Sequence, residues 1–354
     1  MGESASLRFG VIVPCRNEAE VVARRIRNLA RLDWPASDVP HRVLVVDDGS
    51  TDRTAERARA AIDDLGDVAG LAFEVVTNPG PHGKLQAMGL AIEALDDVDL
   101  LLLTDADVVF RADTPRALRD AFARDPRLAM ASGAQEFVDA LADDGSCERP
   151  DGDAPRASGE RYDLLTAWVR RIESNSGRLF SVHGQCLCWR RDLELRPSAG
   201  FAADDLDLRQ QVRARGGRIA LVGGARFLEI KIDDHATRES QALRRAEAYF
   251  QFVRRTPHGA GSGLLDRLHW SAYRFLPEWF PALRWVTVLV LGGLGVAVVV
   301  GLGVPRGLEP LVVLPLATTI AWFLLVTRRI DGWIRRASRA ERAAGLTDSW
   351  ETAR

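Results

Sequence analysis

Two carboxylates stand one residue apart directly after a short apolar run: Asp105 and Asp107 follow residues 100–103. Such a run predicts a buried strand, and open α/β sheets bind ligands at the carboxyl ends of their strands. Side chains at positions i and i+2 of an extended chain point to the same side. Both carboxylates can therefore bind one Mg²⁺ or Mn²⁺ together with the oxygen atoms of a diphosphate. The alternative is that the two aspartates only close the strand with a turn and cap the next helix.

Strands and helices must alternate along the chain to place these carboxylates. We expect strands at residues 9–13, 43–46, 73–76 and 100–103. Pro14 is expected to end the first strand, and Asn17, with Glu20 three residues later, to cap the first helix. A later helix is expected to open at Thr114-Pro115. This rhythm is typical of an α/β fold, with a parallel sheet and crossover helices.

The elements after this point are predicted less regularly. Extended segments are expected at 128–138, 180–189 and 218–222, and helices at 161–173, from 204 to just before Gly216, and at 237–255. Residues 139–159 are rich in Asp, Gly, Ser and Pro and poor in apolar residues. We interpret them as a mobile surface insertion.

Polar residues also follow the other predicted strands. Asp47 and Asp48 follow the second strand, where a carboxylate can accept hydrogen bonds from a ribose or from a uracil ring N–H; a helix-capping turn is the alternative. Lys84 stands in a glycine-flanked loop at a helix start, where a cation can contact a diphosphate, although most lysines are merely solvated. The loop after the first strand should border the same nucleotide, unless it only caps a helix and forms a surface salt bridge. That loop holds Pro14, Arg16 and Glu18.

The composition of the chain bounds its class. A length of 354 residues suggests about two domains, or one domain with appendages. A hydrophobic fraction of 47% allows a sizeable core, and a net charge of -2 argues against a nucleic-acid partner. The four cysteines have neither the density of a disulfide framework nor zinc spacing, so we expect them to be reduced and cytosolic. Because residues 8–13 begin like a core strand, we expect no signal peptide.

The C-terminal third differs in composition from the rest. Residues 264–280 mix aromatic and basic side chains, which suits a helix at a bilayer interface; a helix packed on the globular domain is the alternative. Residues 285–304 and 308–326 are two apolar runs of membrane-spanning length, unless both are buried soluble helices. Arginines flank their outer ends, which predicts that both ends face the cytoplasm. The predicted domains are 1–260, 261–284 (interfacial), 285–327 (transmembrane hairpin) and 328–354 (basic cytoplasmic tail).

As a set, these motifs resemble those of family-2 glycosyltransferases. The matching residues, in order, are 11–18, 45–50, Lys84, 105–107 and 204–205, and the resemblance covers about residues 8–255. It implies a GT-A nucleotide-binding sheet, a UDP- or GDP-sugar donor and inversion at the anomeric carbon. Asp204-Asp205 resembles the Glu-Asp pair of the family, whose second acid is the catalytic base. The resemblance thus implies Asp205 as the base and Asp204 as its support. Because a helix is expected to start there, its N-terminus should keep Asp205 ionised, as a base requires. The alternative is that both acids only favour the helix N-terminus.

The segment 241–245 resembles the Gln-x-x-Arg-Trp motif of membrane-bound synthases in this family. Gln241 and Arg244 match it and would contact the acceptor or the diphosphate, whereas Arg245 replaces the tryptophan. That replacement argues against processive polymer synthesis; a solvated basic helix face is the alternative reading. Gly184 lies where the family often lines the acceptor side, and His235 is a weaker candidate for a further metal ligand than for a surface histidine.

These observations together predict an inverting, metal-dependent glycosyltransferase anchored in the inner membrane as a multi-pass protein, with a cytoplasmic catalytic domain. Its donor would be a nucleotide-sugar, first of all UDP-linked, and its acceptor a lipid or a saccharide. A processive polysaccharide synthase subunit and an inactive membrane-tethered scaffold are the alternatives. A nucleotidyltransferase would need glycine in residues 14–18, and a dinucleotide oxidoreductase would need Gly-x-Gly-x-x-Gly after the first strand. Neither feature is present in the sequence, which disfavours both enzyme classes. The sugar, the protein partners and the oligomeric state have no signature in the sequence.

Overall fold

The computed structural model describes residues 7–138, 140–146, 161–198, 203–230, 235–256 and 263–301, and six single residues between 317 and 332. The chain forms two compact units. The first consists chiefly of Met1–His235, and the second of Ala236–Gly259 and Gly263–Gly345. The predicted catalytic residues from Pro14 to Asp205 all belong to the first unit.

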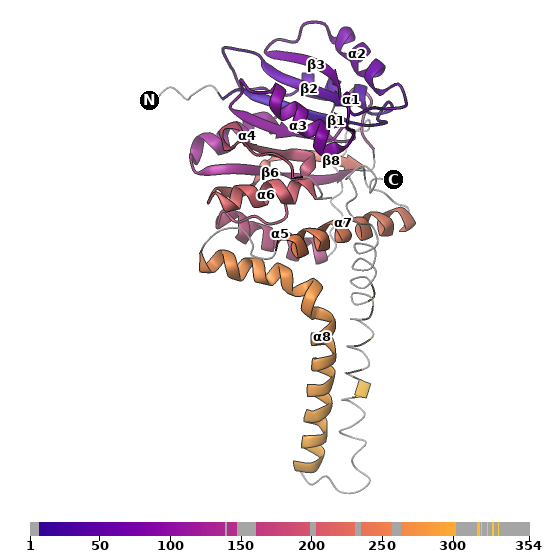
Figure 1. Cartoon of the computed structure of the whole chain (residues 1–354), viewed down its shortest axis with the longest axis vertical. Helices are drawn as coiled ribbons and strands as arrows, with labels where there is room; N and C mark the ends of the chain where they lie inside the picture. Colours follow the sequence, from indigo (N-terminus) through magenta and orange to yellow (C-terminus); the bar gives the residue numbers. More distant parts are fainter. Residues whose placement is uncertain are drawn as a thin grey trace. The chain divides into compact units, whose positions relative to one another are not determined.

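The first unit is built on one mixed sheet of eight strands (Figure 1). The strands are β1 (Phe9–Cys15), β2 (His41–Asp47), β3 (Leu71–Thr77), β4 (Leu100–Leu103), β5 (Val109–Phe110), β6 (Leu128–Val138), β7 (Leu187–Arg190) and β8 (Arg218–Ile230). Their order across the sheet is β3-β2-β1-β4-β7-β6-β8-β5. The pairs among β3, β2, β1 and β4 are parallel, as predicted, whereas β7 is antiparallel to both of its neighbours.

Helices cover both faces of this sheet. One face packs against α1 (Val22–Ala30), α2 (Thr54–Leu65) and α4 (Thr114–Arg124), and the other against α3 (Lys84–Ala94) and α6 (Asp204–Ala214). Alternate residues of each central strand serve the two cores: Leu100 and Leu102 of β4 face the first, and Leu101 and Leu103 face the second. Because both faces are covered, β4 is apolar at every position. α5 (Arg161–Asn175) also belongs to this unit.

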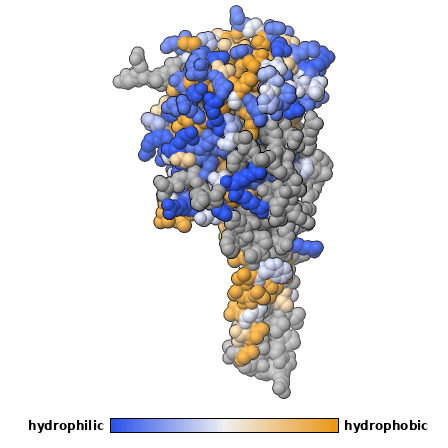
Figure 2. Space-filling view, viewed as in Figure 1, coloured by the Kyte–Doolittle hydropathy of each residue, from blue (hydrophilic) through white to orange (hydrophobic). Residues whose placement is uncertain are grey.

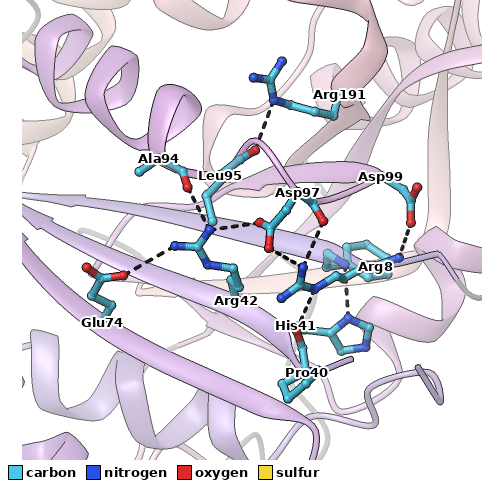
Figure 3. A network of polar contacts seen from close by, with 11 residues as sticks. Arg8, Pro40, His41, Arg42, Glu74, Ala94, Leu95, Asp97, Asp99 and Arg191 are labelled. Carbon is cyan, nitrogen blue, oxygen red and sulfur yellow. Dashed lines mark hydrogen bonds and ion pairs between the residues drawn. The ribbon is translucent and has the colours of Figure 1, made fainter. Parts of the chain in front are cut away.

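A polar network joins the amino ends of the parallel strands, opposite the edge that carries the predicted site (Figure 3). Asp97 accepts hydrogen bonds from Arg8 and Arg42, at 2.5 Å and 2.9 Å, and Arg42 also lies 3.5 Å from Glu74. The amide of Arg8 donates to Asp99 at 2.7 Å. Although partial burial opposes it, hydrogen bonds from Arg42 and Arg8 lower the pKa of Asp97. These contacts fix the starts of β1 to β4 relative to one another.

Two local predictions are wrong for identifiable reasons. Pro14 lies within β1 rather than ending it. The carbonyl of Cys15 accepts from Asp48 on the β2 side, so the nitrogen of Pro14 faces β4, whose pairing with β1 already ends at Ile12; no ladder hydrogen bond is lost there. The extended segment predicted at 180–189 is reduced to β7, because Gly184–Cys186 forms a turn of 3-10 helix.

Part of the predicted insertion is hydrogen-bonded to α1 and to Arg31, which directly follows it. Residues 140–146 make these bonds, through Asp143 to Arg27, Asp144 to Arg31 and Gly145 to Asn28. The mobility expected for residues 139–159 stays a prediction, and the other residues of the insertion lie outside the described residues.

The second unit contains α7 (His235–Arg255) and α8 (Leu264–Gly301). Phe252 and Trp270 pack edge to face, and the hydroxyl of Tyr249 donates to the carbonyl of Tyr273, so the two helices contact each other directly. α8 is one continuous helix through residue 284, and it bends part-way along its length (Figure 1). Within the described ranges, no helix reaches the length and hydropathy needed to cross a membrane. The predicted span 308–326 and the tail 328–354 lie outside those ranges, apart from single residues.

Candidate active site

The carboxyl edge of the parallel strands brings the predicted residues together around one lysine. Lys84 is the first residue of α3, and its Nζ lies 3.1 Å from Asp105 Oδ1 and 3.5 Å from Asp204 Oδ2. The lysine side chain is only 16% exposed. Burial alone would lower its pKa, but the charges of Asp105 and Asp204 raise it overall, so Lys84 stays protonated. Lys84 therefore joins two acidic pairs that lie about a hundred residues apart in the sequence.

The position of Lys84 depends on Asp48. This aspartate is fully buried, and its carboxylate accepts hydrogen bonds from Asn78 Nδ2 and from the amide of Gly83, both at 2.6 Å. Gly83 directly precedes α3. Arg16 and His82 also approach Asp48, at 3.9 Å and 3.7 Å. Asp48 thus anchors the loop from which Lys84 projects, and both of its oxygen atoms already accept internal hydrogen bonds.

Asp47 has the opposite arrangement. It is 5% exposed, and its Oδ1 has no hydrogen-bond partner within the part of the chain that the structure describes. A buried carboxylate oxygen without a donor is costly. A ligand that donates an N–H or O–H group at the end of β2 would satisfy it.

The loops after β1 and β2 are joined by side-chain hydrogen bonds. Asn17 has a left-handed backbone, with φ 59°, and its Oδ1 accepts from the amide of Thr51 at 2.8 Å. The amides of Asn17 and Glu18 donate to Ser50 and Thr54, at 3.0 Å and 2.8 Å. Asn17 therefore does not cap α1, because it bonds to the neighbouring loop instead. Sequence reasoning missed this contact, although clusters of Asn, Asp, Ser and Thr commonly bond to nearby backbone.

Acidic side chains crowd the first loop and the turn after β4. Desolvation and the charges of Asp107 and Asp105 raise the pKa of Glu18 to about 7. Desolvation, followed by the charges of Asp105 and Glu229, raises the pKa of Asp107 to about 6. Glu229, near the end of β8, is a neighbour that sequence reasoning missed. A cation at this position would relieve the repulsion, so the donor set fits a divalent metal.

The described residues do not by themselves complete a metal site. Among the described residues, no three His, Cys, Asp or Glu side chains form a group that could hold a metal ion. Oxygen ligands supplied by a bound molecule would have to complete the coordination, as is common for Mg²⁺ at phosphate sites. The side chain of His235, the other candidate ligand, is not among those described.

Asp204 and Asp205 begin α6. Asp204 is 7% exposed, and Asp205 is half-buried beside Gly184, where an added Cβ would lie 3.8 Å from the Cβ of Asp205. Burial and the charge of Asp204 raise the pKa of Asp205 to about 7, against the amide of Leu206 and the charge of Lys84. The expectation that Asp205 stays ionised is therefore met only in part, because a carboxylate with a pKa of about 7 is about half protonated at pH 7. A carboxylate with this pKa suits proton transfer near neutral pH.

The other predicted site residues are distributed as follows. Pro14 is buried in β1, and Arg16 and Glu18 are half-buried in the following loop. Gln241 and Arg244 lie on α7 in the second unit, whose placement relative to the first is not described.

Comparison with known proteins gives one family match and several structural matches. The family model described as "Glycosyltransferase like family 2" matches residues 7–255. No curated protein sequence matches the chain. Mannosyltransferase PcManGT from Pyrobaculum calidifontis, solved with GDP-Man and Mn²⁺, is similar with a TM-score of 0.63 and 18% identity, over 96% of this chain and 88% of that one. Glucosyl-3-phosphoglycerate synthase from Mycobacterium tuberculosis, solved with Mn²⁺, UDP and glucosyl-3-phosphoglycerate, has a TM-score of 0.45 and 18% identity, over 69% and 79%.

Proposed function

The chain belongs to the glycosyltransferase-like family 2, and from this membership we propose that it transfers a sugar from a nucleotide-sugar to a hydroxyl acceptor with inversion of the anomeric centre. One observation carries the proposal: the ammonium group of Lys84 lies within 3.5 Å of both Asp105 and Asp204. That contact brings the acids proposed for donor binding next to the acids proposed for proton transfer, as a single-displacement reaction requires.

The donor nucleotide is proposed to bind over the ends of β1 and β2. Asp47, whose Oδ1 has no donor among the described residues, would accept from the base or the ribose. Pro14, Arg16 and Glu18 border the same position, while Asp48 holds the adjoining loop through Asn78 and Gly83. Lys84 would turn from Asp105 toward the donor diphosphate, which carries more negative charge than a single carboxylate.

Asp105 and Asp107 would hold a Mg²⁺ or Mn²⁺ ion together with the diphosphate. Such an ion would offset the negative charge that develops on the departing nucleotide. The chain itself contributes two carboxylates on a short turn and, in Lys84, a cation that neutralises Asp105 until the donor arrives.

Asp205 is the proposed general base. Its pKa of about 7 allows it to accept a proton from the acceptor hydroxyl at neutral pH. The hydroxyl oxygen then attacks the anomeric carbon on the side opposite the departing nucleotide, which inverts that centre. Asp204, ion-paired to Lys84, stays in place beside Asp205 and supports it, and Gly184 leaves room on the acceptor side.

We propose that the acceptor is a lipid or a saccharide at the cytoplasmic face of the inner membrane. Support comes from α8, whose apolar side chains are exposed, including Leu289 at 73%, Val290 at 62% and Val300 at 74% (Figure 2). The uncharged run 285–304 and the apolar run 308–326 support a membrane anchor over 285–327. Gln241 and Arg244 would contact the acceptor or the diphosphate, and the absence of the tryptophan at Arg245 favours a single transfer over processive synthesis.

A screen of nucleotide-sugars by thermal unfolding tests the proposal. UDP- and GDP-linked sugars would be added with Mn²⁺, and again with EDTA. A specific donor at 100 times its Kd should stabilise the chain by about 2.7 kcal/mol with the metal. Transfer would then be followed with membrane lipid extract and with oligosaccharides as acceptors. Absence of stabilisation by every nucleotide-sugar would refute the proposal; binding without either transfer or donor hydrolysis would identify an inactive scaffold.

A further inference from the structure

Two polar side chains of α1 are buried where apolar ones would be expected. Arg25 is 0% exposed and Asn28 is 1% exposed, and their neighbours in the helix, Ile26 and Leu29, belong to the apolar core. A guanidinium group removed from water is costly unless protein groups replace the water. The contacts of Arg25 and Asn28 therefore indicate what these residues do.

Both side chains bind the segment that carries the predicted metal ligands. Arg25 Nη2 donates to Thr104 Oγ1 at 2.6 Å, and Arg25 Nη1 donates to the carbonyl of Val108 at 3.3 Å. Asn28 Nδ2 donates to the carbonyl of Phe110, and the amide of Phe110 donates back to Asn28 Oδ1, both at 2.9 Å.

These contacts form one connected unit. Arg25 Nη1 also donates to Asn28 Oδ1 at 2.7 Å, and the guanidinium lies 4.0 Å from the ring centroid of Phe110. Residues 104 to 110 are thus held on both sides of Asp105 and Asp107: at Thr104 before them, and at Val108 and Phe110 after them.

This segment needs such support because the sheet supplies little of it. β4 ends at Leu103 and β5 begins at Val109. The amide of Thr104 still donates to the carbonyl of Ile12 in β1 at 3.0 Å, but residues 105–108 lie outside the strand ladders. Two carboxylates one residue apart repel each other and tend to separate. A rigid support on the core side opposes that separation before any cation is bound.

We infer that Arg25, Asn28 and Thr104 are positioning residues that fix the Asp105–Asp107 turn in the geometry that binds the metal–diphosphate complex. The inference rests on the proposed function, because that function assigns the two aspartates to the metal. None of the three residues needs to touch the substrate. Their effect is on the affinity and placement of the bound cation.

Thr104 offers the cleanest test, because two substitutions separate its hydroxyl from its shape. Thr104→Val keeps the shape and removes the acceptor for Arg25, whereas Thr104→Ser keeps the hydroxyl. Arg25→Met would remove the whole contact but would also take one hydrogen-bond donor each from Asn28 and Thr104, so it serves only as a second variant. Arg31→Met is the matched control: Arg31 directly follows α1, its side chain is 54% exposed, and it pairs with Asp144.

The readout is Mn²⁺ affinity in the presence of UDP or GDP, from the electron paramagnetic resonance signal of free Mn²⁺ with the purified full chain. Loss of a residue that orients metal ligands typically lowers metal affinity about 10- to 100-fold. We expect a loss of this size for Thr104→Val, less than about threefold for Thr104→Ser, and none for Arg31→Met. Nucleotide affinity in EDTA should be the same in the parent chain and in these three variants. A merely structural role would lower the unfolding temperature without this selective loss.

The outcomes distinguish the two proposals. If the parent chain does not bind Mn²⁺ in the presence of either UDP or GDP, the proposed function fails and the positioning role fails with it. If the parent binds and Thr104→Val binds equally well, only the positioning role is overturned. An equal loss in Thr104→Val and Thr104→Ser also overturns it, because the hydroxyl would then not be the cause.

Discussion

Replacing Asp205 by Asn tests the proposed proton transfer most directly. In the parent chain, the amide of Leu206 donates to Asp205 Oδ1 at 2.8 Å. The substitution keeps the size of the side chain and an oxygen that can accept this hydrogen bond. It removes the basicity. General-base catalysis contributes about 10² to 10⁴ in rate, so kcat at saturating donor and metal should fall by about that factor. Donor affinity, measured by calorimetry, should stay within about twofold, because the proposed donor contacts lie on other loops.

The pH dependence gives a second and independent measure. With a pKa of about 7, Asp205 is about 9% ionised at pH 6 and about 91% ionised at pH 8. The rate should therefore rise about tenfold over this interval in the parent chain, and this rise should be absent in Asp205→Asn. This pKa belongs to the free protein, which the pH profile of kcat/KM reports. Glu18 and Asp107 also have raised pKa values, so the contribution of Asp205 is the part of the rise that Asp205→Asn removes.

Asp207→Asn provides the control on the same helix. Asp207 is 6% exposed and accepts from the amide of Ser198 at 2.7 Å and from Gln211 at 3.1 Å. Its substitution should lower the unfolding temperature while retaining the pH rise. An Asp205→Asn variant with the parental rate, or with the parental pH rise, would refute the assignment and direct attention to Asp204. Loss of donor affinity instead would make Asp205 part of the nucleotide site.

Three further predictions concern the metal, the lysine and the anchor. Asp107→Ala should abolish metal-dependent nucleotide binding in calorimetry and leave the unfolding temperature nearly unchanged, since the residue is exposed; binding equal to that of the parent in Mn²⁺ would contradict the metal role. Lys84→Met should lower donor affinity at least tenfold and raise the pKa seen in the rate profile, because the Lys84 charge lowers the pKa of Asp205. Lys84→Arg should keep the parental profile. An unshifted profile in Lys84→Met would count against the proposed coupling of Lys84 to Asp205. Deleting residues 284–354 should move the chain from the membrane fraction to the soluble fraction and retain nucleotide binding; finding the full chain soluble without detergent would contradict anchoring.

Much of the fold follows from local patterns in the sequence. The four residues of β4 are apolar because both faces of the strand are buried, and Leu128–Val138 forms a strand with the predicted bounds. The carboxyl ends of parallel strands share one edge, and this was enough to place Asp47 and Asp105 there. Asp204 was predicted only from the resemblance to the family, because it follows β7, which is antiparallel to β4.

The parts that could not be predicted depend on contacts between distant segments. Asn17 has the right spacing for a helix cap, but Thr51 competes for its side chain across 34 residues. The ion pairs of Lys84 with Asp105 and Asp204 span 21 and 120 residues, and neither follows a local rule. Arg25 reads as part of a basic helix face, because nothing near it in the sequence indicates that Thr104 and Val108 will surround it.

The three acidic pairs of the site share one arrangement. In the free protein, one acid of each pair is held by a residue from another part of the chain. Asp48 bonds to Asn78 and Gly83, while Asp47 keeps a buried oxygen without a described partner. Asp105 and Asp204 are held in the same way by Lys84, beside Asp107 and Asp205, and Asp105 is proposed to bind the metal once Lys84 turns to the donor diphosphate.

Backbone geometry explains the different environments of the two pairs of adjacent acids, Asp47–Asp48 and Asp204–Asp205. Successive residues of a strand point to opposite sides, and successive residues of a helix diverge by about 100°. Neighbouring acids such as Asp47 and Asp48 therefore cannot share one environment. A buried carboxylate is stable only with donors or a cation beside it. Asp48, Asp105 and Asp204 have these partners in the free protein, and Asp105 is proposed to exchange Lys84 for the metal when the donor binds. Internal partners thus hold these carboxylates in place until the donor and the metal arrive.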